Sequence, residues 1–394
     1  MISEKMINWG RKRSVIREIF EYGRARAKLI GADNVFDFTL GNPSIPTPDC
    51  VKETILKLLE TKDSVALHGY TLAQGDEAVR KAVADSITER FGAKVGTEHI
   101  YMTSGAAASL SISLKALAVP GDEFIVFTPF FPEYGIFIES AGGKLVAVPT
   151  KAGSFQIDSS SFEKAITSNT KAVIVNSPNN PSGVVLSAES IDALCGILVE
   201  KSKEYGQTIY LISDEPYREI VYEDTEVPYL MNYYDNTLVC YSFSKSLSLP
   251  GERIGYIAVS DKMHRSDEVY AAVCGAGRAL GYVCASSLFQ MVIAECIGKT
   301  ADISIYRRNR DLLYNGLTDL GFQCIRPDGA FYLFIKAMEE DAGSFCEKAK
   351  RYELLLVPGD DFGCPGYVRI AYCVKTEQIQ RSIPAFKKLA AEYK

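Results

Sequence analysis

LVCYSFSKSLSLPGERIGY, residues 238–256, is the stretch of this chain that decides its fold. An apolar, β-prone run over 238–241 breaks into serines around a single lysine, Lys245. A proline and a glycine then turn the chain, and Arg253 precedes a second strand-like run over 254–259. The stretch therefore predicts two strands joined by a turn that presents one amine and one guanidinium group.

The polar groups of this stretch suit one chemistry. The amine of Lys245 can form a Schiff base with an aldehyde, while Ser242, Ser244 and the fork of Arg253 can hold a phosphate. Together these groups describe a pocket for pyridoxal phosphate (PLP). A solvated loop lysine with a surface arginine fits the spacing equally well, so the rest of the chain has to decide.

Composition places the chain among ordinary globular proteins. It has 394 residues, of which 47% are hydrophobic and 23% charged, and a net charge of -6, which argues against a nucleic-acid surface. The start of the chain lacks the apolar core of a signal peptide, and no apolar run reaches membrane length. The ten cysteines form no CxxC pair, so we expect reduced thiols in a cytoplasmic protein. Three scattered histidines give no reason to expect a metal site.

The middle of the chain alternates short apolar runs with helical patterns, which predicts a mainly parallel sheet covered by helices on both faces. The strands are predicted at 124–127, 144–148, 172–175, 209–212 and 238–241, and the helices between them at 133–140, 159–167 and 188–203. In such a sheet the site forms at the carboxyl ends of the strands. The segments that follow the strands are TPFFPEY, NSPNNPSG, SDEPYRE and SFSK, and each carries polar or aromatic groups.

Two further segments indicate close backbone approach to a ligand. TSGAAASL, residues 103–110, places a turn of small residues before a helix, where free backbone N–H groups can bind an anion. In GNPSIPTP, residues 41–48, three prolines exclude regular structure and Gly41 permits a close approach. GAGRALG, residues 275–281, only approximates the dinucleotide fingerprint and lies within a helical pattern, so that interpretation is rejected.

The last third of the chain predicts a second, smaller domain. Long helical patterns are followed by strands at 331–335, 354–357 and 367–371 and by a helix from Thr376. We expect a large domain over 48–290 and a small α+β domain composed of 1–47 and 291–394.

Taken together, NNPSG, SDEPY, SFSK-x7-R and YVRIAY resemble the fold type I PLP-dependent aminotransferases, close to the aspartate and aromatic group. The motifs stand in the family's order and at its spacing, and the resemblance covers nearly the whole chain. It implies an α/β fold with a mainly parallel, seven-stranded sheet in a large PLP-binding domain beside a smaller α+β domain.

The resemblance assigns catalytic roles to specific residues. Lys245 matches the Schiff-base lysine, which then carries the substrate proton and needs a lowered pKa for that task. Asp214 matches the aspartate that pairs with the pyridine nitrogen of the cofactor. Strand alternation points the neighbouring Glu215 to the other side. Tyr217 and Asn180 match the residues that contact the ring hydroxyl.

The same resemblance predicts how the cofactor is held. Phe131 matches the aromatic side chain that stacks on the ring, although a core phenylalanine is nearly as compatible with the sequence. Tyr70 matches a tyrosine that reaches the phosphate of the neighbouring subunit, which implies a homodimer with shared sites. The expected phosphate-binding residues are Ser104, Gly105, Ala106, Ala107, Ser242, Ser244 and Arg253.

The substrate is less well marked. Arg369 matches the arginine that grips the α-carboxylate, with Gly41 and Asn180 beside it. Arg278 lies about where one branch uses a partner-subunit arginine for a distal carboxylate, and an exposed helix arginine explains it as well. Ala107 stands where another branch has a lysine for that carboxylate.

Two aromatic residues, Phe331 and Tyr332, offer a different substrate pocket, one that tolerates aromatic side chains. The implied function is transamination between an L-amino acid and a 2-oxo acid, with glutamate and 2-oxoglutarate as one pair and an aspartate or aromatic donor favoured. PLP-dependent β-elimination, as in cystathionine lyases, would use the same catalytic residues and stays open. A PLP-binding regulator is not expected, because the acidic chain leaves no room for a DNA-binding domain ahead of its core.

Overall fold

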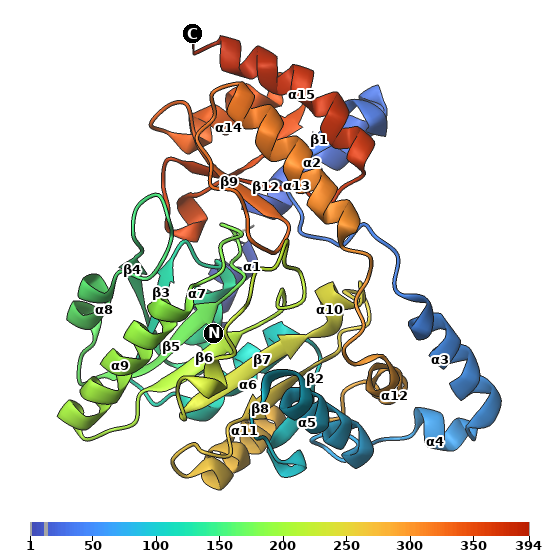
Figure 1. Cartoon of the computed structure of the whole chain (residues 1–394), viewed down its shortest axis with the longest axis vertical. Coiled ribbons are helices and arrows are strands. Elements are labelled where there is room, and N and C mark those ends of the chain that lie inside the picture. Colours follow the sequence, from blue (N-terminus) through green and yellow to red (C-terminus); the bar gives the residue numbers. More distant parts are fainter. Residues whose placement is uncertain (1, 12–14, 394) are drawn as a thin grey trace.

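The computed structural model describes residues 2–11 and 15–393. Two layers of sheet lie one above the other along the long axis, with the larger sheet below and the C-terminal elements above (Figure 1). The large sheet has seven strands in the order β2-β8-β7-β6-β5-β3-β4. Their bounds are β2 Ile100–Thr103, β3 Glu123–Thr128, β4 Lys144–Pro149, β5 Thr170–Asn176, β6 Tyr210–Asp214, β7 Thr237–Ser242 and β8 Gly255–Val259.

The mainly parallel sheet is confirmed. Strands β3 to β7 pair in parallel, and only β8 runs antiparallel to its neighbours β7 and β2. The predicted strands are present with ends moved by one or two residues, except that the one predicted at 354–357 is divided into two short strands of different sheets, β10 (Leu354–Leu355) and β11 (Val357–Pro358). Strand β2 and the two-residue strand β1 (Phe36–Asp37) were not predicted. Both are short edge elements, which give little periodicity to read.

The helices comprise eleven of nine residues or more and four short ones within the described part of the chain. They are α1 Glu4–Arg11, α2 Val15–Ile30, α3 Asp49–Thr61, α4 Ser64–His68, α5 Glu77–Phe91, α6 Ala106–Leu117, α7 Glu133–Ala141, α8 Ser159–Ala165, α9 Ala188–Tyr205, α10 Phe243–Ser246, α11 Ser266–Leu280, α12 Ser287–Cys296, α13 Ser304–Asp319, α14 Ala342–Lys350 and α15 Thr376–Ala391. Of these, α1, α4 and α10 were not predicted; at α10 a turn between two strands was expected.

Helices cover both faces of the large sheet, and the alternation of side chains along β3 shows how. Phe124 and Val126 face α6, α7 and α11, while Ile125 between them faces α8 and α9. Strands buried on both faces require the nearly continuous apolar runs that the sequence shows. The carboxyl ends of these strands all open toward the upper layer.

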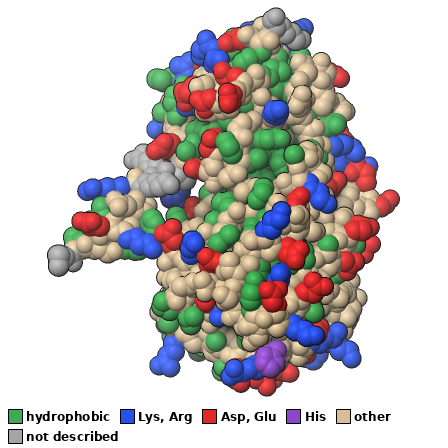
Figure 2. All heavy atoms as spheres, turned by 90° about the vertical axis from the view of Figure 1, so that its left-hand side faces the viewer, with side chains coloured by type: hydrophobic (Ala, Val, Ile, Leu, Met, Phe, Trp, Pro, Cys, Tyr) green, Lys and Arg blue, Asp and Glu red, His purple; other side chains and the backbone are tan. Residues whose placement is uncertain are grey.

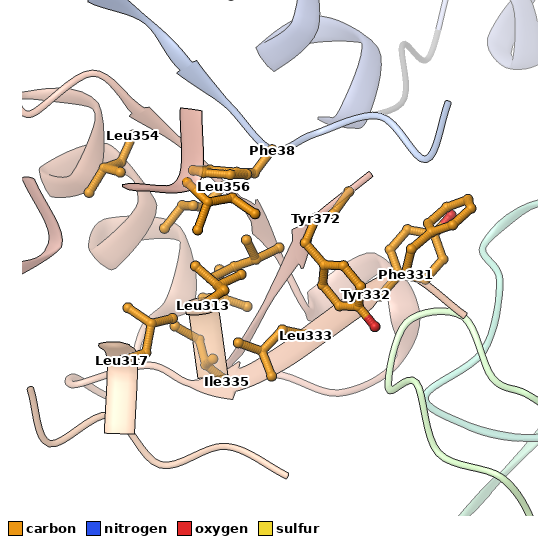
Figure 3. Close-up of a cluster of buried hydrophobic side chains, with 14 of the residues drawn as sticks. Phe38, Leu313, Leu317, Phe331, Tyr332, Leu333, Ile335, Leu354, Leu356 and Tyr372 are labelled. Carbon is orange, nitrogen blue, oxygen red and sulfur yellow. The ribbon is translucent and has the colours of Figure 1, made fainter. Parts of the chain in front are cut away.

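The upper layer contains a three-stranded antiparallel sheet in the order β11-β12-β9, whose strands are Val357–Pro358, Tyr367–Ala371 and Tyr332–Lys336. Leu313 and Leu317 of α13 pack with Leu333 of β9, and Phe38 and Leu356 complete the same core (Figure 3). The N-terminal part joins this layer, because β1 pairs in parallel with β10 (Leu354–Leu355).

The exact domain boundaries stay a prediction. The expected limit at residue 290 falls inside α12, and that helix packs in one core cluster with α3, α5 and β2.

Lysine, arginine, aspartate and glutamate side chains are interspersed over the face drawn in Figure 2. Within residues 2–11 and 15–393, no helix has the length and apolarity needed to cross a membrane, and no three or more His, Cys, Asp or Glu side chains are placed to hold a metal ion.

Candidate active site

A cavity of about 320 Å³ lies where the two layers meet. Its floor comes from the carboxyl ends of β5, β6 and β7 and from the start of α6, and its opposite wall comes from β9, β12, the segment after β1 and α2. This is the place expected for a ligand in an open α/β sheet. The charged and polar side chains that line it are Asn176, Asn180, Asp214, Tyr217, Ser242, Ser244, Lys245, Arg253, Tyr332 and Arg369.

Lys245 is a half-buried residue of the four-residue helix α10, which begins directly after β7. Ser242 caps this helix through its Oγ, which accepts a hydrogen bond of 3.2 Å from the Ser244 backbone N–H. The Lys245 ammonium donates to the carbonyl of Gly41 at 2.6 Å. The pKa of Lys245 is lowered to about 8, chiefly by burial and also by the positive charges of Arg253 and Arg369, while the Cys373 thiol opposes the shift. A fraction of the amine is therefore neutral near pH 7, as a nucleophile and proton carrier requires.

Asp214 ends β6 at the floor of the cavity. Its Oδ2 accepts a 2.6 Å hydrogen bond from the Tyr134 hydroxyl, whereas its buried Oδ1 has no partner among the described residues. The pKa of Asp214 is raised to about 7, chiefly by burial. The Tyr134 hydrogen bond opposes this rise and the charge of Glu215 adds to it. An N–H donor carrying positive charge at Oδ1 would satisfy the free oxygen and favour the ionised form.

Tyr134 is a site residue that the sequence analysis did not single out. It lies at the start of α7, three residues after Phe131, and the two rings meet edge to face with centroids 5.7 Å apart. The signal was present in TPFFPEY, since a hydroxyl-bearing aromatic side chain near a strand end is able to reach the next strand. Its partner could not be read from the sequence, because Asp214 is 80 residues away.

Glu215 points away from the cavity, as strand alternation predicts. Ser213 donates a 2.6 Å hydrogen bond to its Oε1, and Arg218 pairs with it, with Nη2 at 2.9 Å from the same oxygen. Both carboxylate and guanidinium are buried. This pair is structural, so Asp214 is left as the only carboxylate lining the cavity within the described chain.

The start of α6 has the features of an anion site. Gly105 precedes the helix with φ +85°, and no side chain caps the free N–H groups there. A Cβ on Gly105 would lie 2.9 Å from Nη2 of Arg253, so the backbone and this guanidinium meet closely. Arg253 Nη1 lies 3.4 Å from Ser244 Oγ. Ala106 and Ala107 line the cavity, whereas Ser104 and Gly105, which were predicted with them as phosphate-binding residues, are not among the lining residues.

Arg369 is the cation of the opposite wall and is only 2% exposed. Its Nη1 donates to Asn180 Oδ1 at 3.1 Å and its Nη2 to the Thr39 carbonyl, while Nε is buried without a partner in the part of the chain described. The guanidinium carbon lies 4.8 Å from the centre of the Tyr332 ring. A buried guanidinium with a free N–H suits a carboxylate ligand.

Tyr332 and Tyr217 join the two walls, because their hydroxyls are hydrogen-bonded at 2.8 Å. A Cβ on Gly41 would lie 1.9 Å from the Tyr332 hydroxyl, so only glycine fits there. Phe331, the other aromatic residue predicted for this pocket, is fully buried beneath Lys245 and does not line the cavity.

Two further predicted residues, Tyr70 and Arg278, lie outside this cavity. Tyr70, between α4 and α5, is 99% exposed, and Arg278 is exposed near the end of α11. The segments that carry them are neighbours, because the Cys284 backbone N–H donates to the Ala73 carbonyl at 3.1 Å. If these residues serve a site, it is the site of another copy of the chain.

Comparison with known proteins agrees with this geometry. The family model for aminotransferases of class I and II matches residues 33–386. The chain belongs to this family. It is 30% identical to an aspartate aminotransferase of Thermotoga maritima, covering 91% of this chain and 92% of that protein, and 31% identical to an aspartate/prephenate aminotransferase of Thermus thermophilus, covering 89% and 90%.

Solved structures of aminotransferases superpose over almost all of the chain. An aminotransferase from Eubacterium rectale is 56% identical with a TM-score of 0.98, covering 100% of this chain and 99% of that one. The aspartate aminotransferase of Thermus thermophilus with maleate is 28% identical with a TM-score of 0.86, covering 99% of both chains. The protein is thus a PLP-dependent transaminase with the two-domain α/β fold of its family, and nothing in these comparisons favours the β-elimination alternative.

The cavity fits the cofactor of this family, pyridoxal phosphate. The unpartnered Oδ1 of Asp214 is the acceptor that a protonated pyridine nitrogen needs. The uncapped start of α6 beside Arg253 is the cradle that a phosphate needs. The two features lie in one cavity with the amine of Lys245.

Proposed function

We propose that this transaminase takes its amino group from a dicarboxylic or aromatic L-amino acid and uses 2-oxoglutarate and glutamate as one substrate pair. The observation that carries the proposal is Arg369, a buried guanidinium that lines the same cavity as Lys245 and whose Nε has no partner among the described residues. Related proteins named aspartate and aspartate/prephenate aminotransferases support the substrate class. Structures of the Thermus relative hold maleate, a dicarboxylate, and a mutant of it holds tryptophan.

Each residue of the cavity has a defined task in this proposal. When bound, PLP supplies an electron-withdrawing ring that weakens the Cα–H bond of an attached amino acid. Lys245 would take the proton from Cα and pass it to the cofactor, using the neutral fraction that its lowered pKa provides. Asp214 would accept the hydrogen bond of the ring nitrogen and keep that nitrogen protonated. Tyr217 and Asn180 would contact the ring hydroxyl, and Phe131 would stack on the ring.

Arg369 orients the substrate by binding its α-carboxylate with two N–H groups. Arg369→Lys keeps the charge but loses the planar fork, so we expect kcat/KM for glutamate to fall roughly 30-fold, a loss of about 2 kcal/mol. The rate at which glutamate alone converts the bound cofactor to its amine form, followed by absorbance, measures this loss. Arg326→Lys, at an exposed ion pair with Asp311, is the matched control. Equal rates in the two variants would contradict the clamp.

Among residues 2–11 and 15–393, no cation of the same chain is left for the distal part of the substrate. The cations that line the cavity are Lys245, Arg253 and Arg369, all engaged in the tasks above, and Ile16 and Leu40 make the remaining wall apolar. We therefore propose a homodimer in which Arg278 of one copy reaches the cavity of the other. Exposed apolar side chains surround that arginine and Tyr70, which supports a contact surface there; they are Val65, Leu72, Leu280, Tyr282 and Val283.

Arg278→Ala is expected to lower kcat/KM for aspartate and glutamate about 10- to 100-fold, because a second carboxylate loses its partner. Activity with phenylalanine or tyrosine should change less than twofold. A panel of amino donors with 2-oxoglutarate measures the selectivity, and Arg265→Ala at the other end of α11 is the control. A uniform change across the panel would show that Arg278 does not bind the distal carboxylate. Sedimentation of the wild type as a monomer would contradict a site shared between two copies.

We also propose that the enzyme works in the cytoplasm as a two-domain protein divided near residues 48 and 290. All ten cysteines are free in the structure, which supports a reducing compartment. The packing of α2 and β1 with the C-terminal strands supports a small domain formed from both ends of the chain.

A further inference from the structure

A chain of polar side chains lies behind the lysine helix α10, outside the cavity; it is buried at Ser246 and Tyr241 and reaches the surface at Arg90. Ser246, the neighbour of Lys245, has its Oγ 3.0 Å from the hydroxyl of Tyr241 on β7. The same hydroxyl donates to Glu219 Oε2 at 2.7 Å, and Nη2 of Arg90 on α5 lies 3.0 Å from Glu219 Oε1. A phenol has one hydrogen and Glu219 receives it, so the Ser246 hydroxyl supplies the hydrogen of its own bond.

The members of this chain are held firmly in place. Tyr241 is 4% exposed, stacks on Tyr256 with centroids 4.9 Å apart, and meets Phe243 edge to face. Ser246 is 2% exposed, and its backbone carbonyl accepts a 2.8 Å hydrogen bond from the Ala301 N–H. The carboxylate of Glu219 therefore has a fixed phenol on one side and a guanidinium on the other.

The helix that this chain contacts cannot hold its own shape. A four-residue helix has almost no internal hydrogen bonding, so neighbouring groups must set its orientation. A small rotation of α10 moves the amine of Lys245 at the end of its four-carbon side chain. A misplacement of about 1 Å in a reacting group costs roughly 100-fold in rate.

We propose that Glu219 and Tyr241 are positioning residues for Lys245, acting through Ser246 on α10. The inference rests on the proposed role of Lys245 as the proton carrier. It assigns a function to Glu219, the last residue of the SDEPYRE motif. Glu219 contacts Tyr241 on the side of α10 away from the cavity, whereas Asp214 of the same motif lines the cavity.

Tyr241→Phe tests this directly, because it keeps the stacked ring and removes both hydrogen bonds. We expect kcat to fall about 10-fold while KM for glutamate and 2-oxoglutarate stays within twofold. We also expect a readout that needs no turnover. The midpoint at which the absorbance of the holoenzyme's bound cofactor titrates should move up by about half a pH unit. A looser α10 would let water reach the nitrogen that links Lys245 to the cofactor, and hydration favours the charged form of that nitrogen. The groups facing the amine, Arg253, Arg369 and the Cys373 thiol, are unchanged in the variant.

Ser246→Ala is the second variant, since it cuts the same chain at its other end and leaves the bond between Tyr241 and Glu219 intact. Tyr234→Phe is the matched control: Tyr234 is also 4% exposed and donates a 2.7 Å hydrogen bond to the Ile209 carbonyl, away from α10. The control should lose thermal stability to a similar extent and keep its kcat and its titration midpoint.

If kcat and the midpoint of Tyr241→Phe and Ser246→Ala match those of Tyr234→Phe, the positioning role is overturned. The proposed role of Lys245 is checked separately, by borohydride reduction of the wild-type holoenzyme and mass spectrometry. A label on another lysine would overturn that role whatever the Tyr241 variant does.

Discussion

Lys245→Ala is expected to lower transamination by about four orders of magnitude or more, the largest effect of any single substitution in this chain. The variant loses both the amine that attaches to the cofactor and the base that moves the Cα proton. Asp214 is the only carboxylate that lines the cavity among the described residues, and as acceptor for the ring nitrogen it is not placed to take over the proton.

The cofactor should still bind to this variant without a covalent bond, because the start of α6, Ser242, Ser244 and Arg253 do not depend on the lysine. Absorbance after dialysis measures retained PLP, and single-turnover mixing with glutamate measures the residual rate. Lys262→Ala, at an exposed position, is the control. Turnover within tenfold of the wild type would show that a different residue carries the proton.

Asp214→Asn is expected to have the second largest effect, a loss of roughly 1,000-fold in kcat/KM, corresponding to about 4 kcal/mol. The amide keeps the shape of the side chain and an oxygen for the Tyr134 hydroxyl, but it cannot stabilise a protonated ring nitrogen at the position of Oδ1. Single-turnover rates with glutamate measure the loss, and Asp192→Asn, exposed on α9, is the control.

Although Asp214→Asn lowers activity, it should raise the stability of the cofactor-free protein above neutral pH. The pKa of Asp214 is raised by burial to about 7, so the folded state favours the protonated acid, and the stability it gives is lost as the pH rises from about 4 through 7. Asparagine cannot ionise and avoids that loss. We expect the thermal midpoint of the cofactor-free variant to exceed that of the wild type at pH 8 and to approach it at pH 4. A variant that is less stable at pH 8 would contradict the raised pKa.

Local sequence was sufficient for the core of the fold. The apolar runs of β3 to β7 are continuous because both faces of these strands are buried. In the helices between them, apolar residues recur every three to four positions. Short strands and helices show too little of this hydrophobic periodicity to be predicted. Strand β2 has only four residues at the sheet edge, and α4 only five, so neither offers enough periods to read.

The residues that carry chemistry were visible in the sequence because each follows a strand. Lys245, Asp214 and Asn180 had to meet at the carboxyl edge of the sheet once the strands were parallel, and the cavity does contain them. Arg369 was visible for another reason, since a guanidinium within an apolar strand is costly unless it has a partner.

Contacts between distant segments were decided only by the tertiary structure. Three such contacts could not be predicted, because local sequence patterns say nothing of residues far apart in the chain. They are the hydrogen bond from Tyr134 to Asp214, the Tyr217–Tyr332 bridge and the chain from Arg90 to Ser246. The opening stretch shows this division well. Its residue types and spacing made Lys245 one candidate for a reactive amine, and the other strand-end motifs favoured that interpretation. The burial that lowers the pKa of the amine, and the polar chain proposed to hold its helix from behind, depend on side chains that only folding brings beside it.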